Sequence, residues 1–152
     1  MDRKDREILS LLQRDASLAV AAIAEQVHLS PGPCWRRIRA LELAGFIRRR
    51  VAILDPAKLN VGTTVFVTLK TSRHDAEWFE LFATRVRAIP EVVEFHRMSG
   101  DVDYLLRLAI PDINAYDRVY KQLIGIGGLS DVSASFALEC IKSTTELPLD
   151  YV

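Results

Sequence analysis

The sequence predicts an α+β protein made of two parts, and two observations support this. Up to residue 43, apolar residues recur only with the 3.6-residue period of amphipathic helices. From residue 64, segments with the two-residue period of strands appear as well. The second part then runs strand, helix, strand, strand, helix, strand. That order is the ferredoxin-like βαββαβ arrangement with an antiparallel sheet. We therefore expect a helical domain over residues 1–62 and a ferredoxin-like domain over residues 63–152.

Three short helices are expected in the first part. Residues 2–14 form the first, because Ile8, Leu11 and Leu12 share one stripe. The second carries the apolar residues Val20, Ile23, Ala24 and Val27. A third begins after Ser30, which can accept from a free backbone N–H, and Pro31 suits its first position. Its stripe is Cys34, Ile38 and Leu41, and Gly45 is placed to end it.

The outer side of the third helix is basic. At 100° per residue, Arg36 and Arg39 fall opposite the apolar stripe, and Arg37 lies on a flank. Between Ser30 and Arg50 the only acidic residue is Glu42. Two short helices, a tight turn and an arginine-bearing face are typical of a helix-turn-helix, which predicts double-stranded DNA as a partner. The alternative is a small helical core whose arginines are merely solvated.

The residues expected to contact DNA come from this helix and from the basic cluster that follows it. They are Ser30, Gly32, Arg36, Arg37, Arg39, Arg48, Arg49 and Arg50. Arg36 and Arg39 are candidates for base contacts, because a guanidinium can bond guanine O6 and N7; Arg37 is equally suited to a phosphate or an internal acid. Trp35 faces sideways and is expected to pack in the core or against backbone rather than to stack on a base.

Charge is distributed unevenly along the chain. The formal net charge is zero, yet residues 1–62 hold four more basic than acidic side chains and residues 63–152 hold four fewer. Such asymmetry is expected when only one part approaches phosphates. Residues 48–54 alternate weakly and could form a short strand or wing, which would make the first part a winged helix-turn-helix. Asp55-Pro56 ends that segment, and residues up to Gly62 are the expected linker.

In the second part the strands are rich in β-branched residues. The expected elements are a strand at Thr64–Lys70, a helix at Asp75–Ile89, strands at Val92–Met98 and Tyr104–Ile110, a helix opening at Pro111-Asp112, and a last strand at Val132–Lys142. Two helices would cover one face of the sheet. Apolar residues of the first and last strands are expected on the other face, which predicts sheet-to-sheet pairing of two copies.

Several function classes are disfavoured. No apolar run reaches the length of a membrane span, and the charged start contains no signal core, so we expect a cytoplasmic protein. Cys34 and Cys140 both lie in apolar stripes and are expected to be buried, reduced thiols. The three histidines lack metal-ligand spacing, and no nucleophile elbow or dinucleotide fingerprint is present. We expect no metal, no cofactor and no catalytic residues.

Motifs along nearly the whole chain resemble those of the Lrp/AsnC (leucine-responsive/asparagine regulator, or feast/famine) transcription factors. They are Asp2-Arg3-Lys4-Asp5, Leu29-Ser30-Pro31, Pro33-Cys34, Arg37-Ile38, Leu41-Glu42, Gly45-Phe46-Ile47, Asp55-Pro56, Pro90-Glu91-Val92, Gly100–Arg107, Ile141–Thr145 and Leu147-Pro148-Leu149. The resemblance implies a helix-turn-helix, a hinge strand and an amino-acid-binding ferredoxin-like domain. It also implies dimers that assemble further, to tetramers or octamers. Gly32 departs from the family, where many members carry a hydroxyl residue.

The resemblance also implies an effector site near the turn that begins at Gly100. The expected residues are Ser99, Gly100, Asp101, Val102, Asp103 and Tyr104. An α-amino acid needs an acceptor for its ammonium group, which Asp101 and Asp103 can supply, and donors for its carboxylate, which backbone N–H groups around Gly100 can supply. The alternative is a Gly-Asp hairpin turn whose acids only satisfy local N–H groups.

Together these observations predict a sequence-specific DNA-binding transcriptional regulator that responds to a small amino acid. Two other classes stay open. One is an architectural protein that compacts DNA with little sequence preference. The other is a regulatory subunit of a metabolic enzyme, built on the ferredoxin-like half.

Overall fold

The computed structural model describes all residues, 1–152, and divides into two compact units. The first consists of Met1–Ile53 together with the C-terminal segment Ile141–Val152, and the second of Leu54–Cys140. This division differs from the predicted boundary in two ways. The first unit ends before the expected linker, and it includes the last residues of the chain, whose contacts are with the first helix.

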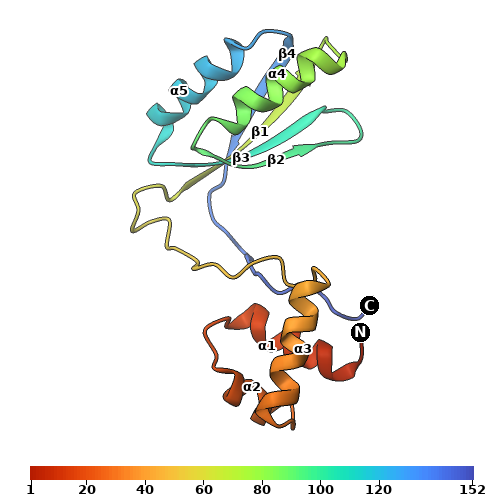
Figure 1. Ribbon diagram of the computed structural model, residues 1–152. Helices are drawn as coiled ribbons and strands as arrows, with labels where there is room; N and C mark the ends of the chain where they lie inside the picture. The colour runs from red at the N-terminus through yellow and green to blue at the C-terminus, as the bar shows by residue number, and fades with distance from the viewer. The chain divides into compact units, whose positions relative to one another are not determined.

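The first unit contains three helices: α1 (Arg3–Arg14), α2 (Val20–Gln26) and α3 (Pro31–Leu43) (Figure 1). Their predicted apolar stripes meet in one core, formed by Ile8, Leu12, Ile23, Ala24, Val27, Cys34, Ile38 and Leu41. A capping box starts α1: the Asp2 carboxylate accepts from the Asp5 N–H, and the Asp5 carboxylate accepts from the Asp2 N–H. The helix-turn-helix arrangement predicted from the sequence is confirmed.

The two ends of α3 are built differently from one another. At its C-terminus Gly45 has φ +78°, and the N–H groups of Gly45 and Phe46 donate to Glu42 and Leu41. This is the predicted glycine ending, a Schellman motif. At its N-terminus Ser30 occupies the capping position, but its hydroxyl makes no capping bond. Pro33, the third residue of the helix, has no N–H to donate, so only the N–H of Gly32 is available for a capping bond and it is not used.

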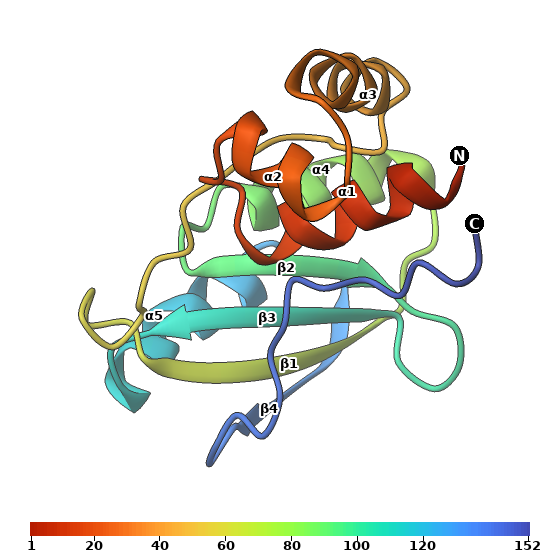
Figure 2. The same cartoon turned by 90° about the horizontal axis from the view of Figure 1, so that it is seen from below.

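The second unit is a four-stranded antiparallel sheet with two helices on one face. Its elements are β1 (Thr63–Thr71), α4 (Ala76–Arg87), β2 (Val92–Arg97), β3 (Tyr104–Ile110), α5 (Ile113–Ile124) and β4 (Leu129–Phe136), and the strand order is β2-β3-β1-β4. Figure 1 shows α4 and α5 on the same side of the sheet, and Figure 2 shows the strands from the other side, the uncovered face, on which neither of these two helices lies. The ferredoxin-like prediction is confirmed.

The loop between α5 and β4 is locked onto the core by Trp78 of α4. The Trp78 Nε1–H donates to the Gly127 carbonyl at 2.9 Å, and the ring stacks on Phe82 with 4.8 Å between centroids. The Gly128 carbonyl accepts from the Thr71 hydroxyl at 2.8 Å. Gly127 and Gly128 both have φ near +80°, a conformation that favours glycine. This short glycine loop therefore joins α4, β1 and β4.

The uncovered face of the sheet is more polar than the sequence suggested. The cross-strand pairs put Val132, Ala134 and Phe136 of β4 opposite buried β1 residues, so these three apolar residues face the helices. On the uncovered face β4 presents serines. The apolar contribution there comes from β1 and β3, chiefly Phe66, which is 39% exposed, and Leu105. The prediction was wrong for the last strand because the alternation phase of Val-Ser-Ala-Ser-Phe does not show which face is covered.

Three further expectations are corrected. Residues 48–54 form no strand, so the helical unit has no wing of its own. The last strand ends at Phe136 instead of Lys142, because the chain leaves the sheet to reach the helical unit. Cys140 is consequently exposed, whereas Cys34 is buried as expected and its thiol pKa is raised by desolvation. No helix is long and apolar enough to span a bilayer.

Candidate nucleic-acid interface and ligand-binding turn

Helix α3 leaves a basic face on the outside of the helical unit. Because Cys34, Ile38 and Leu41 point into the core, Arg36 and Arg39 are exposed, as their positions in the helix predict. Arg36 has no ion pair or hydrogen bond within the protein, whereas Arg39 pairs with Glu42, three residues further along. The guanidinium of Arg36 is therefore free to bond an external acceptor.

Arg37 is held inside the unit. Its Nη1 donates to Asp2 at 2.7 Å and to Asp5 at 2.8 Å, the two acids of the α1 capping box. The bond to Asp5 raises the pKa of Arg37, and the backbone N–H of Asp5 together with Arg37 lowers the pKa of Asp2. Arg37 was expected to bind either a DNA phosphate or an acidic side chain of the protein. In the structure it binds two acidic side chains. It fastens α3 to the start of α1.

The second basic cluster, Arg48 to Arg50, lies in irregular exposed chain after α3. Arg50 donates to Glu42 at 3.2 Å, so this carboxylate binds both Arg39 and Arg50. Arg48 and Arg49 have no acidic partner. The one acid in this region is therefore shared by two cations, and the surface keeps a net positive charge.

The turn that leads into α3 exposes two further donors. The Ser30 hydroxyl is unpaired, and Gly32 offers the only N–H among the first three helical residues, since prolines hold the other two positions. A Cβ added at Gly32 would meet nothing within 4 Å. Trp35 is 54% exposed and lies outside the core, contrary to expectation, because it follows Cys34 by one residue and points about 100° away from it.

The turn between β2 and β3 is open to solvent and carries both aspartates. Met98 N–H donates to the Asp103 carbonyl, and Asp103 N–H donates to Leu69. The N–H groups of the four residues between them, 99–102, have no acceptor in the protein. Gly100 has φ +113°, so the backbone there reverses in a way that a side chain would hinder. Four neighbouring free N–H groups form a donor set that a carboxylate could use.

The two aspartates differ in availability. Asp103 accepts from the N–H of Thr71 on β1 at 2.8 Å, so it is already engaged by the backbone of a neighbouring strand and not by an N–H of its own hairpin turn. Asp101 is 93% exposed and pairs with Lys70 at 2.9 Å. Asp101 first, then Asp131 and Asp103, raise the pKa of Lys70. Because these three carboxylates lie near the single ammonium group of Lys70, this part of the surface carries a net negative charge.

Two residues change the predicted ligand site. Tyr104 is 5% exposed, and its ring packs against Phe79, Phe82 and Phe95 in the core, because alternation along β3 turns it toward the helices. Burial raises its pKa. The Tyr104 side chain therefore lies in the core beneath the sheet and is not available to contact a ligand at the turn. Lys70 was not predicted. Its place as the last residue of the expected first strand was the only signal available in the sequence.

A helix-turn-helix unit joined to a ferredoxin-like unit defines a class of two-domain transcriptional regulators. Family models match both parts: the AsnC-type helix-turn-helix domain over residues 1–42 and the Lrp/AsnC ligand binding domain over residues 64–147. The chain belongs to the Lrp/AsnC family.

Characterised relatives are similar to this chain over nearly its full length. It is 47% identical to the DNA-binding transcriptional activator DecR of Escherichia coli, covering 99% of both chains. It is also 47% identical to the glutamate uptake regulatory protein of Zymomonas mobilis, covering 98% of this chain and 91% of that one. Both relatives are regulatory proteins, and the first is a DNA-binding transcriptional activator.

Two solved structures are similar to the chain as a whole. One is an AsnC family transcriptional regulator from Agrobacterium tumefaciens, 59% identical with a TM-score of 0.95 and 99% of both chains covered. The other is a transcriptional regulator from Neisseria meningitidis in complex with L-methionine. It is 38% identical with a TM-score of 0.94, covering 99% of this chain and 98% of that one.

Proposed function

We propose that this chain is a sequence-specific DNA-binding regulator whose activity is set by a small amino acid. The observation that carries the proposal is the outer face of α3, where Arg36 is exposed and unpaired on a helix whose other side is fixed in the core. Arg36 and Arg39 then contact bases or nearby phosphates in the major groove. Ser30, Gly32, Arg48, Arg49 and Arg50 contact the backbone.

The effector site in this proposal is the turn of residues 99–103. Its free N–H groups receive the carboxylate of the amino acid, and Asp101 exchanges its bond to Lys70 for one to the ammonium group. Lys70 is then released to pair with the carboxylate as well, so a zwitterion is matched by an acid and a base 2.9 Å apart. The methionine complex of the Neisseria relative supports an amino acid as the ligand class.

Homodimers are part of the same proposal, and they assemble further to tetramers or octamers. Phe66 and Leu105 lie on the uncovered face of the sheet, where a second copy would bury them. Replacing Phe66 by Asp is expected to shift the mass in solution toward the monomer, measured by light scattering. An unchanged mass would exclude this face as the interface.

Selection of bound fragments from genomic DNA, with and without an equimolar mixture of the twenty standard amino acids, tests the function. We expect a small set of enriched sites whose occupancy changes with the mixture. Equal affinity for random and selected fragments would favour an architectural role instead. Calorimetric titration of the same amino acids, repeated on Asp101→Ala, tests the site, and Asp117→Ala on α5 is the matched control. Ligand binding that survives in Asp101→Ala would exclude Asp101 as the ammonium acceptor.

A further inference from the structure

The C-terminal segment, residues 141–152, packs with the helical unit although it follows the last strand of the other unit. Only four residues, 137–140, separate the end of β4 from this segment. The chain therefore passes between the two units twice, once near residue 54 and once near residue 140. The second passage links the sheet of the ligand-binding unit directly to the helices of the DNA-binding unit.

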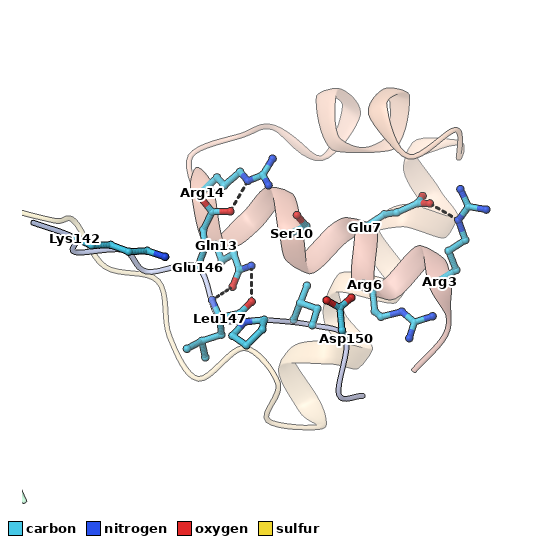
Figure 3. Close-up of a pocket in the computed structure, with 12 residues that line it drawn as sticks. Arg3, Arg6, Glu7, Ser10, Gln13, Arg14, Lys142, Glu146, Leu147 and Asp150 are labelled. Atoms are coloured by element: carbon cyan, nitrogen blue, oxygen red, sulfur yellow. Dashed lines mark hydrogen bonds and ion pairs between the residues drawn. The ribbon is translucent and has the colours of Figure 1, made fainter.

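The last turn of α1 binds three consecutive residues of the segment, and Figure 3 shows two of them, Glu146 and Leu147, beside Arg14 and Gln13. The Gln13 side chain exchanges two hydrogen bonds with the backbone of Leu147, accepting at 2.9 Å and donating at 3.2 Å. The Thr145 hydroxyl donates to the Gln13 carbonyl at 2.8 Å. Arg14 pairs with Glu146 at 2.7 Å. Near the other end of α1, Arg6 donates to the Val152 carbonyl at 2.8 Å.

Apolar residues of the segment lie beside the second arginine cluster. Leu147, Pro148 and Leu149 line a cavity of about 380 Å³ together with Leu9 and Leu12 of α1, Phe46 and Ile47. The same cavity is lined by Arg48, Arg49 and Arg50. The docked segment therefore forms one wall around the chain that carries these arginines, and its loss would remove that support.

The segment is held by contacts that can be broken. It has no regular secondary structure, the side chains of Arg14 and Glu146 are 61% and 43% exposed, and Leu147 is 72% exposed. Exposed ion pairs contribute little, and exposed irregular chain opens at low free energy. A segment with these properties can exist in docked and released states in the same protein.

We infer that residues 141–152 form a releasable strap that carries the effector signal to the DNA-binding unit. With the strap docked on α1, the chain that bears Arg48 to Arg50 is ordered for DNA. The strap continues from β4, which pairs along β1, the strand that carries Lys70 of the effector turn. An amino acid bound at that turn acts on the strap through this strand pair and changes the docked fraction. This inference rests on the proposed function, because an effector acts only as far as its affinity differs between the two states.

Two variants loosen the strap without touching the turn at residues 99–103. Leu149→Asp places a carboxylate at a part-buried position of the apolar cavity, and Gln13→Ala removes the two side-chain bonds to Leu147. Asp150→Asn is the matched control, because Asp150 lies in the same segment and makes no hydrogen bond. The dissociation constant for a genomic fragment selected by the wild type is measured with and without the twenty-amino-acid mixture.

In the wild type and in Asp150→Asn we expect the mixture to change the dissociation constant by at least about fivefold. In both strap variants the change should fall to less than about twofold, while calorimetry still detects binding of the amino acids, with the affinity of the released state. The exposed thiol of Cys140, labelled with monobromobimane, should report the movement, since Cys34 is buried. Its fluorescence should respond to the mixture in the wild type and lie at the released level in the variants.

Three results would overturn the inference, and only one of them would also contradict the proposed function. A full wild-type response in both strap variants would exclude the strap alone. Loss of all DNA binding in both variants would make the segment a fixed part of the helical unit. A wild type that binds DNA but shows no response to amino acids would contradict the proposed function as well, because no signal would then exist to transmit.

Discussion

Replacing Gly128 by Ala tests whether the glycine loop fastens the ferredoxin-like unit. A Cβ at residue 128 would lie 2.4 Å from the Nε1 atom of Trp78 and 2.9 Å from its Cε2 atom. Such distances require the indole ring or the loop to move. Trp78 is 3% exposed and stacked on Phe82, so the ring has no space to move without disturbing the core.

The expected loss of stability has three sources. A residue with a Cβ at φ +81° costs about 1–2 kcal/mol in backbone strain. Overpacking against a buried ring costs about 1–3 kcal/mol. The hydrogen bond from Trp78 to Gly127 contributes about 1 kcal/mol and is lost if the ring shifts. We expect Gly128→Ala to reduce the free energy of unfolding by about 3–6 kcal/mol.

The neighbouring glycine supplies the control. Gly127 has φ +78°, but a Cβ there would meet nothing within 4 Å, so Gly127→Ala should cost only the strain of about 1–2 kcal/mol. Urea unfolding, followed by the fluorescence of Trp78 in a Trp35→Phe background, measures both variants. Equal losses in the two variants would refute the argument, because they would show that the contact with Trp78 adds nothing to the backbone strain.

Three other predictions concern the helical unit. Arg36→Ala should weaken specific DNA binding by about 1–3 kcal/mol in a salt-controlled titration and leave the melting temperature unchanged; unchanged affinity would remove Arg36 from the interface. His28→Gly should raise stability by about 1 kcal/mol in urea unfolding, because His28 has φ +53° at the end of α2; a loss would show that its side chain is needed there. In Asp2→Asn the melting temperature should fall less steeply than in the wild type as the pH is lowered. The folded pKa of Asp2 lies below its ordinary 3.8, so its contribution is complete above that value and disappears as pH falls through the folded pKa. Parallel curves for wild type and variant would contradict this.

Local sequence rules predicted most of the fold. The stripe of Cys34, Ile38 and Leu41 placed α3 and its outer face correctly, and Gly45 ended the helix as expected, because both depend on residues close together in the sequence. The family motifs extended this agreement to the whole chain. That the Ser30 hydroxyl cannot accept from the third helical residue was also predictable, since Pro33 has no N–H.

What the sequence did not reveal depends on residues distant in the chain. Arg37 meets Asp2 and Asp5 more than thirty positions away, so nothing near it distinguished an internal acid from a phosphate. The side of the sheet occupied by Tyr104 depends on which face the helices cover, and alternation alone does not fix that face. The return of residues 141–152 to α1 was hidden for the same reason, because their apolar residues continue the last strand in appearance.

Helix α1 contacts α3 near its N-terminus and the C-terminal segment in its last turn. Near its first residue, Asp2 and Asp5 bind Arg37 of α3, and in its last turn Gln13 and Arg14 bind the C-terminal segment. A helix of twelve residues is about 18 Å long and stiff over that length, so a displacement at one end is delivered at the other. Helix α3 and the C-terminal segment that follows the ligand-binding unit are thus attached to the same rigid element. In the proposed strap mechanism, a movement of the segment therefore reaches the helix that carries Arg36 through α1, although no residue of the segment belongs to α3.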